Sequence, residues 1–105
     1  MWKRACSIEE IRPGEAFRLE CKPPVAIFNV AGELFATADT CTHAQSSLAE
    51  GYIEGDTVEC GYHFAKFCVK TGQVISPPAF VSLKTYSVKV ESGQVLVDLA
   101  DGMST

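Results

Sequence analysis

The sequence predicts an all-β protein, built as an antiparallel β-sandwich or barrel of short strands. Three observations indicate this fold class: several short apolar, β-branched runs, glycine-bearing turns between them, and only one short helical signal. The chain has 105 residues, of which 47% are apolar and 21% are charged. These proportions are ordinary for a folded globular protein, and the length predicts a single domain over residues 1–105.

The first expected elements are a short helical turn and a hairpin. Ser7 and Glu10 have the spacing of a capping box, but Pro13-Gly14 limits the helix to a turn or two. Further along, an apolar run is followed by Ala31-Gly32 and a second apolar run, which predicts a β-hairpin. Its strands are expected at residues 25–30 and 33–37.

The later elements are also short strands. Two are expected at residues 57–59 and 67–70, the second followed by a turn at Thr71-Gly72. From Tyr86 to Val90 apolar residues alternate with polar ones, the period of two that is typical of a half-buried strand. Ser92-Gly93 predicts a turn, and residues 94–98 predict the returning strand.

Two stretches match no strand pattern, residues 39–54 and residues 76–79. The first is long for a loop in a small domain, and loops of that length are usually functional or disordered. We therefore expect a loop over residues 39–54 that is either functional or disordered.

The charge of the chain excludes several classes of partner. The net charge is −4 and the isoelectric point is near 5.0, so phosphate backbones and anionic lipid headgroups repel the chain. No apolar run approaches the roughly 20 residues of a membrane span. The N-terminus has no signal-peptide core, so we expect a cytoplasmic protein that binds neither nucleic acid nor membrane.

The five cysteines are an odd number, so disulfides cannot use all of them. In a reducing compartment a set of thiols favours metal binding or reactivity over disulfides. We interpret Cys6, Cys21 and Cys68 as small buried side chains. Cys41 and Cys60 differ, because each stands within three positions of one of the two histidines.

Cys41-Thr42-His43 and Cys60-Gly61-Tyr62-His63 indicate a metal site. Thiolate and neutral imidazole are the ligands that zinc, copper and iron–sulfur clusters prefer. Two cysteines and two histidines can hold one structural zinc ion, although zinc sites usually pair like ligands. Each segment here supplies one cysteine and one histidine, which suits a binuclear centre better. The spacing alone allows both kinds of site.

The two segments resemble the Rieske [2Fe–2S] motif. The resemblance extends over nearly the whole chain, to the small Rieske ferredoxins of bacterial aromatic-ring-hydroxylating dioxygenase systems. The further motifs that carry it are Asn29-Val30, Gly32-Glu33-Leu34-Phe35, Gly51-Tyr52, Lys66-Phe67-Cys68, Thr71-Gly72 and Pro77-Pro78.

This resemblance implies a fold and a ligand set. The fold is a Rieske-type antiparallel β-sandwich with a small cluster-binding subdomain, whose loops span approximately residues 39–68. One [2Fe–2S] cluster is the implied cofactor: Cys41 and Cys60 would bind the inner iron, and His43 and His63 the outer iron. Ser76-Pro77-Pro78 would shield the cluster.

Some positions depart from the Rieske proteins of respiratory and photosynthetic cytochrome complexes. Those proteins join the two cluster loops by a disulfide, and the matching positions here are Ser46 and Tyr62. They also place a serine hydroxyl near a bridging sulfide, where this chain has Ala65. Fewer hydrogen-bond donors to the cluster lower its reduction potential, so we expect a value around −150 mV.

The resemblance also implies a function, that of a soluble one-electron carrier. The carrier would take electrons from an NADH-dependent flavoprotein reductase and pass them to a terminal aromatic-ring-hydroxylating oxygenase. The chain has no second histidine set for a mononuclear iron and no Gly-x-Gly-x-x-Gly fingerprint for a flavin or nicotinamide, so we expect no catalytic residues. The alternatives are a zinc-stabilised interaction module and a Rieske-type small subunit of another redox enzyme, such as a nitrite reductase.

Acidic residues are concentrated in the middle of the chain, where no lysine or arginine occurs between Pro23 and Ala65. Such a stretch is often no more than a solvated face. The alternative is that part of it steers a basic surface of a redox partner, an effect that salt weakens. The residues considered for steering are Glu50, Glu54, Asp56 and Glu59.

Overall fold

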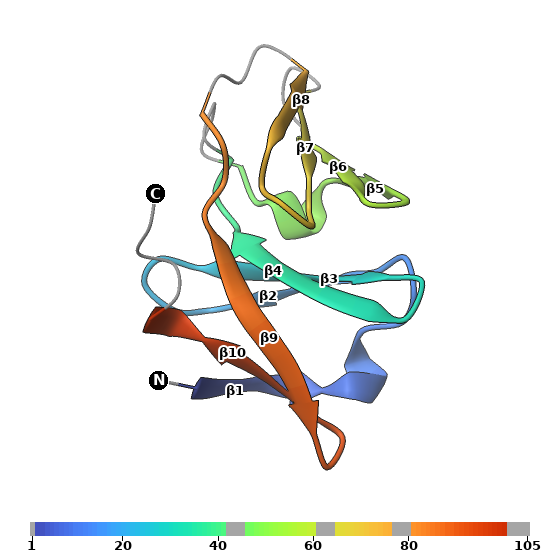
Figure 1. Ribbon diagram of the computed structural model, residues 1–105, viewed down its shortest axis with the longest axis vertical. Helices are drawn as coiled ribbons and strands as arrows, with labels where there is room; N and C mark the ends of the chain where they lie inside the picture. Colours follow the sequence, from blue (N-terminus) through green and yellow to red (C-terminus); the bar gives the residue numbers. More distant parts are fainter. Residues whose placement is uncertain (1, 42–45, 61–64, 77–80, 101–105) are drawn as a thin grey trace.

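The computed structural model describes residues 2–41, 46–60, 65–76 and 81–100 and shows two antiparallel sheets (Figure 1). We call the six-stranded sheet, of order β1-β10-β9-β4-β3-β2, the base. The four-stranded sheet, of order β5-β6-β7-β8, forms the tip together with the short helix η2. The base strands are β1 (Trp2–Ser7), β2 (Ala16–Leu19), β3 (Val25–Val30), β4 (Glu33–Ala38), β9 (Thr85–Glu91) and β10 (Gln94–Asp98). The tip contains η2 (Leu48–Glu50), β5 (Tyr52–Glu54), β6 (Thr57–Glu59), β7 (Lys66–Cys68) and β8 (Val74–Ser76).

The base is a sandwich of two three-stranded halves. One half contains β2, β3 and β4, and the other contains β1, β10 and β9. The halves are joined where β4 pairs with β9, over only two residue pairs, Ala36 with Tyr86 and Thr37 with Thr85. This arrangement confirms the predicted antiparallel β-sandwich.

Both predicted two-residue hairpin turns are present. Ala31 and Gly32 have φ of 53° and 96°, and Ser92 and Gly93 have φ of 51° and 78°. Two successive residues with positive φ give a turn whose twist matches that of the paired strands. The first turn is also held by the side chain of Asn29, whose Oδ1 accepts a hydrogen bond from the Gly32 N–H at 2.7 Å.

The predicted helical turn is also present, as the 3₁₀ helix η1 (Ile8–Glu10) with the Ser7–Glu10 capping box at its start. The other helix in the described part of the chain, η2, is equally short. None of the described helices has the length and apolar character needed to cross a membrane.

Several short strands were not expected from the sequence. Residues 39–54, predicted as a loop, contain η2 and β5, and β8 ends at Ser76, inside the second predicted loop. Strands β1 and β2 were not expected either. The strand predicted at residues 67–70 is β7, Lys66–Cys68, because the chain turns directly after Cys68, whose carbonyl accepts a hydrogen bond from the Gly72 N–H at 2.7 Å.

The alternation predicted for β9 holds only for part of the strand. Tyr86 and Val88 pack against the base core, but Val90 is 46% exposed. Val90 lies near the end of the β9–β10 hairpin, which projects beyond the rest of the base (Figure 1). The alternation of apolar and polar residues in the sequence therefore continues beyond the part of β9 that contacts the core.

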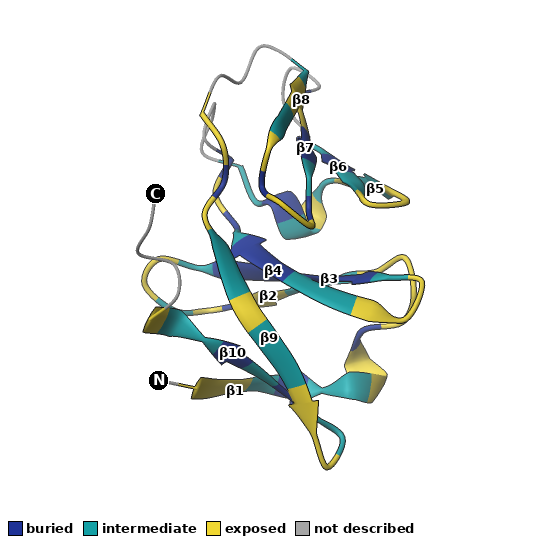
Figure 2. Cartoon of the chain, viewed as in Figure 1, coloured by how far each residue is buried: buried dark blue, intermediate teal, exposed yellow. Residues whose placement is uncertain are grey.

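Strand β3 is buried over nearly its whole length (Figure 2). It separates two hydrophobic cores. Val25 and Ile27 point into the base core, whereas Ala26 and Phe28 belong to the core of the tip. All four are 0% exposed. The tip therefore packs directly on the outer face of a base strand, which explains why this run contains no polar alternation.

Candidate metal centre

Cys41 and Cys60, the two predicted cysteine ligands, lie in the same core cluster of the tip. Their exposed fractions are 3% and 1%. The predicted ligands His43 and His63 fall outside the described residues, as do Tyr62 and Pro77-Pro78. The structure therefore places two of the four predicted ligands and brings both into one core.

The two predicted ligand segments, residues 41–46 and 60–65, are each closed by a backbone hydrogen bond of the same kind. The Cys41 N–H donates to the carbonyl of Ser46 at 3.0 Å, and the Cys60 N–H donates to the carbonyl of Ala65 at 2.7 Å. Each bond joins a cysteine to the fifth residue after it, and each of the two closed segments includes one histidine. The first follows β4, and the second connects β6 with β7.

Ser46 joins the two segments. Its carbonyl closes the first segment on Cys41, and its side-chain Oγ lies 2.9 Å from the Sγ of Cys60 in the second. The sequence identified Ser46 only as a position without a cysteine, so this contact was not anticipated. No local pattern in the sequence pairs this serine with Cys60.

The first ligand segment is fixed by Asp39, a buried carboxylate that is 1% exposed. Its Oδ1 accepts hydrogen bonds from the Ser47 hydroxyl and the Ala49 N–H, both at 2.9 Å. Ser47 is the N-cap of η2 but makes no side-chain cap bond, so Asp39 caps this helix from outside it. In the sequence, Asp39 stands out only as the first residue of the predicted loop over residues 39–54.

Asp39 also connects the tip to the base. Its N–H donates to the carbonyl of Pro24 at 3.0 Å, and its carbonyl accepts from the Leu48 N–H at 2.7 Å. The Nε of Arg18, on β2, lies 3.4 Å from Oδ2 of Asp39 and 3.2 Å from the exposed Glu20 carboxylate. Asp39 is two positions before Cys41, so this network fixes where the first ligand segment begins.

Two glycines allow backbones to approach closely in the tip. A Cβ at Gly72, which has φ of +77°, would lie 2.3 Å from the carbonyl oxygen of Leu83, and a Cβ at Gly51 would lie 2.4 Å from that of Glu59. The Leu83 N–H in turn donates to the Gly72 carbonyl at 2.7 Å. The β7–β8 turn therefore holds the chain where it leaves the tip for the base.

The surroundings of the two cysteines fit a bound iron–sulfur group. Phe67, Leu48 and Val58 are fully buried in the same core, so water is largely excluded from the two sulfurs. A buried thiolate is costly unless it meets a cation or hydrogen-bond donors, and a metal centre supplies the cation. Among the described residues no group of three or more potential ligands gathers, as expected when two of the predicted four lie outside them.

The other three cysteines differ in environment. Cys6 is buried in the base core, and this burial raises the pKa of its thiol to about 11. Cys21 is half-buried, and burial also raises its pKa. Cys68 was expected to be buried but is only half-buried. Burial acts to raise its pKa, but hydrogen bonds with Thr71 and the Lys70 backbone lower it below the usual value.

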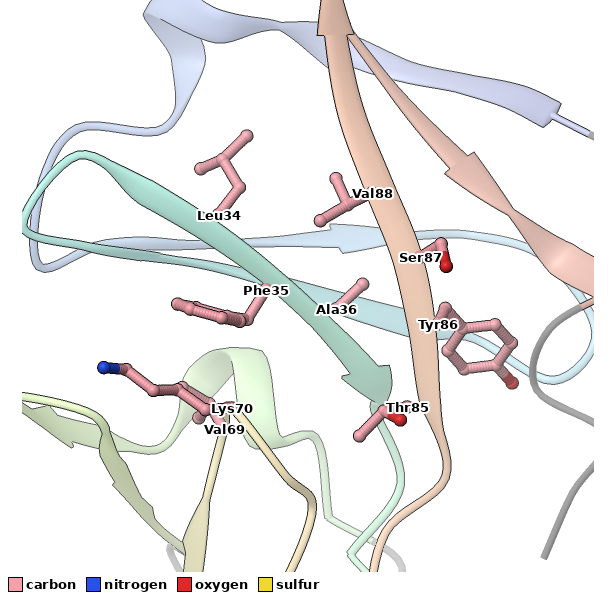
Figure 3. Close-up of a pocket in the computed structure, with 9 residues that line it drawn as sticks. All are labelled: Leu34, Phe35, Ala36, Val69, Lys70, Thr85, Tyr86, Ser87 and Val88. Atoms are coloured by element: carbon pink, nitrogen blue, oxygen red, sulfur yellow. The ribbon is translucent and has the colours of Figure 1, made fainter.

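A groove of about 370 Å³ lies where the base meets the tip (Figure 3). Base strands β4 and β9 form one side, and Val69 and Lys70 of the tip lie opposite them. The Lys70 Nζ is 5.6 Å from the centre of the Phe35 ring, a cation–π contact across this boundary. Among the described residues, neither Cys41 nor Cys60 lines the groove.

The residues considered for steering all lie on the tip. Glu50, Glu54 and Asp56 are exposed, and Glu59 is partly exposed. They belong to η2, β5, β6 and the turn between these strands, which places them on the same part of the molecule as the two cysteines. We call these four residues the acidic edge.

Comparison with known proteins shows close relatives over nearly the full chain. The family described as the Rieske [2Fe-2S] domain matches residues 1–87. The ferredoxin component of biphenyl 2,3-dioxygenase from Rhodococcus jostii (strain RHA1) is 52% identical over 97% of this chain and 96% of its own.

Solved structures agree with this match. The complex of reduced oxygenase and oxidized ferredoxin in carbazole 1,9a-dioxygenase contains a chain with 38% identity and a TM-score of 0.88, covering 91% of both chains. The Sphingomonas yanoikuyae B1 ferredoxin has 34% identity and a TM-score of 0.88, covering 93% of this chain and 98% of its own.

Proposed function

Because the chain belongs to the Rieske [2Fe-2S] domain family and carries a Rieske-type [2Fe–2S] cluster, we propose that Cys41, His43, Cys60 and His63 are the four ligands. The cluster takes the place of the single zinc ion that the cysteine and histidine spacing also allowed. When bound, it accepts and releases one electron at a time. The chain is therefore an electron carrier rather than a catalyst, in agreement with its relatives, which are named ferredoxin components or subunits of dioxygenases.

One observation supports the ligand set most strongly, namely the matched closure of the two segments. Both begin at a buried cysteine, both close on the fifth residue after it, and Ser46 joins them. Two loops that each supply one cysteine and one histidine are what a Rieske cluster requires. The buried side chains around the cysteines keep water from the sulfurs, and the Asp39 network holds the first segment in position.

The ligand set is tested by spectroscopy of the reduced protein. We expect the wild-type protein to give a Rieske-type EPR signal and to contain acid-labile sulfide, and His63→Ala and Cys60→Ser to lose the signal. Cys68→Ser is the matched control, because Cys68 lies in the tip but outside the proposed set. A Rieske signal that survives in His63→Ala, or is lost in Cys68→Ser, would contradict the assignment.

The proposed partners are a flavoprotein reductase and a terminal oxygenase. In this proposal an NADH-dependent reductase reduces the carrier in the cytoplasm, and the carrier then reduces an aromatic-ring-hydroxylating oxygenase. The similarity to a ferredoxin solved in complex with the oxygenase of carbazole 1,9a-dioxygenase supports the second step. The similarity to ferredoxin components of biphenyl dioxygenases supports aromatic compounds as the substrates of that oxygenase.

Electron transfer is tested by reconstitution. The carrier, a dioxygenase-type flavoprotein reductase and the oxygenase of a biphenyl dioxygenase are mixed with NADH and biphenyl. We expect product only when all three proteins are present, and anaerobic bleaching of the carrier only when reductase and NADH are added. Product formation at the same rate without the carrier would contradict the proposal.

The acidic edge supports electrostatic steering of these partners. Charges separated by more than about 10 Å are screened at 0.1 M salt, so steering weakens as ionic strength rises. We expect the second-order rate of reduction by the reductase to fall with salt, and to fall less steeply in Glu54→Gln/Asp56→Asn. Glu33→Gln, an exposed change on the base, is the control. A rate independent of salt would exclude steering.

A further inference from the structure

We propose that the Ser46 hydroxyl raises the reduction potential of the cluster by donating a hydrogen bond to the Sγ of Cys60. This inference rests on the proposed function, because it requires Cys60 to be a cluster ligand. It assigns to Ser46 a tuning role in addition to the backbone bond with which Ser46 closes the first ligand segment.

The structure shows the contact between the two atoms, and the protonation state of the sulfur determines which atom donates the hydrogen bond. Ser46 Oγ and Cys60 Sγ are 2.9 Å apart, within hydrogen-bond distance, and either atom of a neutral pair can donate. A cysteine that binds iron is a thiolate and has no proton to donate. The hydroxyl of Ser46 is therefore the donor whenever the cluster is bound.

The environment makes this hydrogen bond effective. Cys60 is 1% exposed and lies among apolar side chains, where little water competes for the sulfur. Reduction adds a negative charge to the cluster and its ligand sulfurs, so a donor at the sulfur stabilises the reduced form more than the oxidised form. The potential is consequently higher with the hydroxyl than without it.

Ser46 also replaces a covalent link by a polar one. The respiratory Rieske proteins described above have a disulfide cysteine at this position, whereas here the connection between the two segments ends on the proposed ligand sulfur itself. The same atom pair thus connects the two loops and acts on the cluster. A purely structural role and a tuning role predict different measurements.

The test is the reduction potential of Ser46→Ala, measured by protein-film voltammetry or by an EPR-monitored redox titration of the loaded protein. We expect the equilibrium constant of one-electron reduction to decrease about threefold to tenfold, which is a fall of about 28 to 59 mV. Ser46→Thr keeps a hydroxyl and is expected to restore most of the potential. Ser47→Ala is the matched control, because the neighbouring hydroxyl bonds Asp39 and not Cys60.

The outcomes separate this inference from the proposed function. A Ser46→Ala protein that keeps full cluster content and an unchanged potential would overturn the tuning role while leaving the ligand set intact. An equal fall in Ser46→Ala and Ser47→Ala would also overturn it, because it would show an effect of loop distortion. Loss of the Rieske signal in wild-type protein would overturn the proposed function instead.

Discussion

The base and the tip are sheets of the same antiparallel kind, but they are stabilised differently. The strands of the base have four to seven residues, whereas each strand of the tip has three. The base core consists mainly of aliphatic side chains, while the tip core contains the two cysteines proposed as ligands and also includes Phe28 of β3. Such short strands bury little apolar area themselves, so the tip depends on the base and on its cluster.

The largest expected effect on stability comes from truncating the side chains of β3, the strand that lies between the two cores. Phe28→Ala removes a fully buried ring between base and tip and should cost about 3–5 kcal/mol, and Ile27→Ala, on the opposite face, about 2–5 kcal/mol. We expect Phe28→Ala to lose visible cluster absorption before far-UV circular dichroism during urea denaturation. Ile27→Ala should lose both together, and the opposite pattern would show that the tip does not depend on Phe28.

A second test concerns the close backbone approach at the β7–β8 turn. Gly72→Ala forces an alanine to a positive φ, at about 1–2 kcal/mol, and brings its Cβ against the Leu83 carbonyl, at about 1–3 kcal/mol more. Gly55→Ala has the same sign of φ but meets no atom within 4 Å, so only the first cost applies. Thermal unfolding measures both variants. Equal destabilisation would mean that the contact with Leu83 contributes nothing.

A smaller effect is expected from weakening the connection through Asp39. Asp39→Asn keeps the side-chain shape but removes the charge and one acceptor from a buried site, which should cost about 1–3 kcal/mol. Glu20→Gln is the control, because this exposed carboxylate pairs with the same Arg18 and should change stability by about 0–1 kcal/mol. Chemical denaturation that ranks the two variants in the reverse order would contradict the role given to Asp39.

The smallest expected effect is a difference in reactivity between one thiol of the base and one thiol of the tip. It is measured without any substitution. With a pKa of about 11, Cys6 in the base has about one thiolate per thousand molecules at pH 8. The pKa of Cys68 in the tip is lowered, so its thiolate fraction at the same pH is higher. We expect iodoacetamide to label Cys68 first and Cys6 last, as followed by mass spectrometry of the loaded protein. Labelling of Cys6 at the rate of Cys68 would show that the base opens readily.

Four of the six base strands were predictable from the sequence, as were β6 and β7 of the tip, whereas β1, β2, β5 and β8 were not. Strands β3 and β4, and likewise β9 and β10, carry β-branched residues and are joined by a two-residue turn, and both features are local signals. Strands of three residues, such as β5 and β8, are too short to show a period. Their existence depends on pairing with β6 and β7 rather than on their own composition.

Cys41 and Cys60, which we propose as ligands, could be singled out from the sequence because their spacing to histidine is a local pattern. Asp39 and Ser46 were not, because their roles depend on partners that are distant in the sequence. Asp39 meets Arg18 from β2, and Ser46 meets the sulfur of Cys60 from the second segment. An acidic residue and a serine in a polar loop give no sign of such partners until the chain is folded.

Strand β3 limits how the protein can vary. A typical surface strand tolerates polar replacement at every second position, but Val25, Ala26, Ile27 and Phe28 offer no position that faces water. Neutral sequence drift is therefore restricted at four successive positions. A larger side chain on one face of β3 must be compensated by smaller neighbours in the same core. Otherwise the strand backbone is displaced, and this displacement disturbs the packing of the other core. Adaptation of the tip to new partners is consequently expected on the outer faces of β5 to β8, away from the strand that carries them.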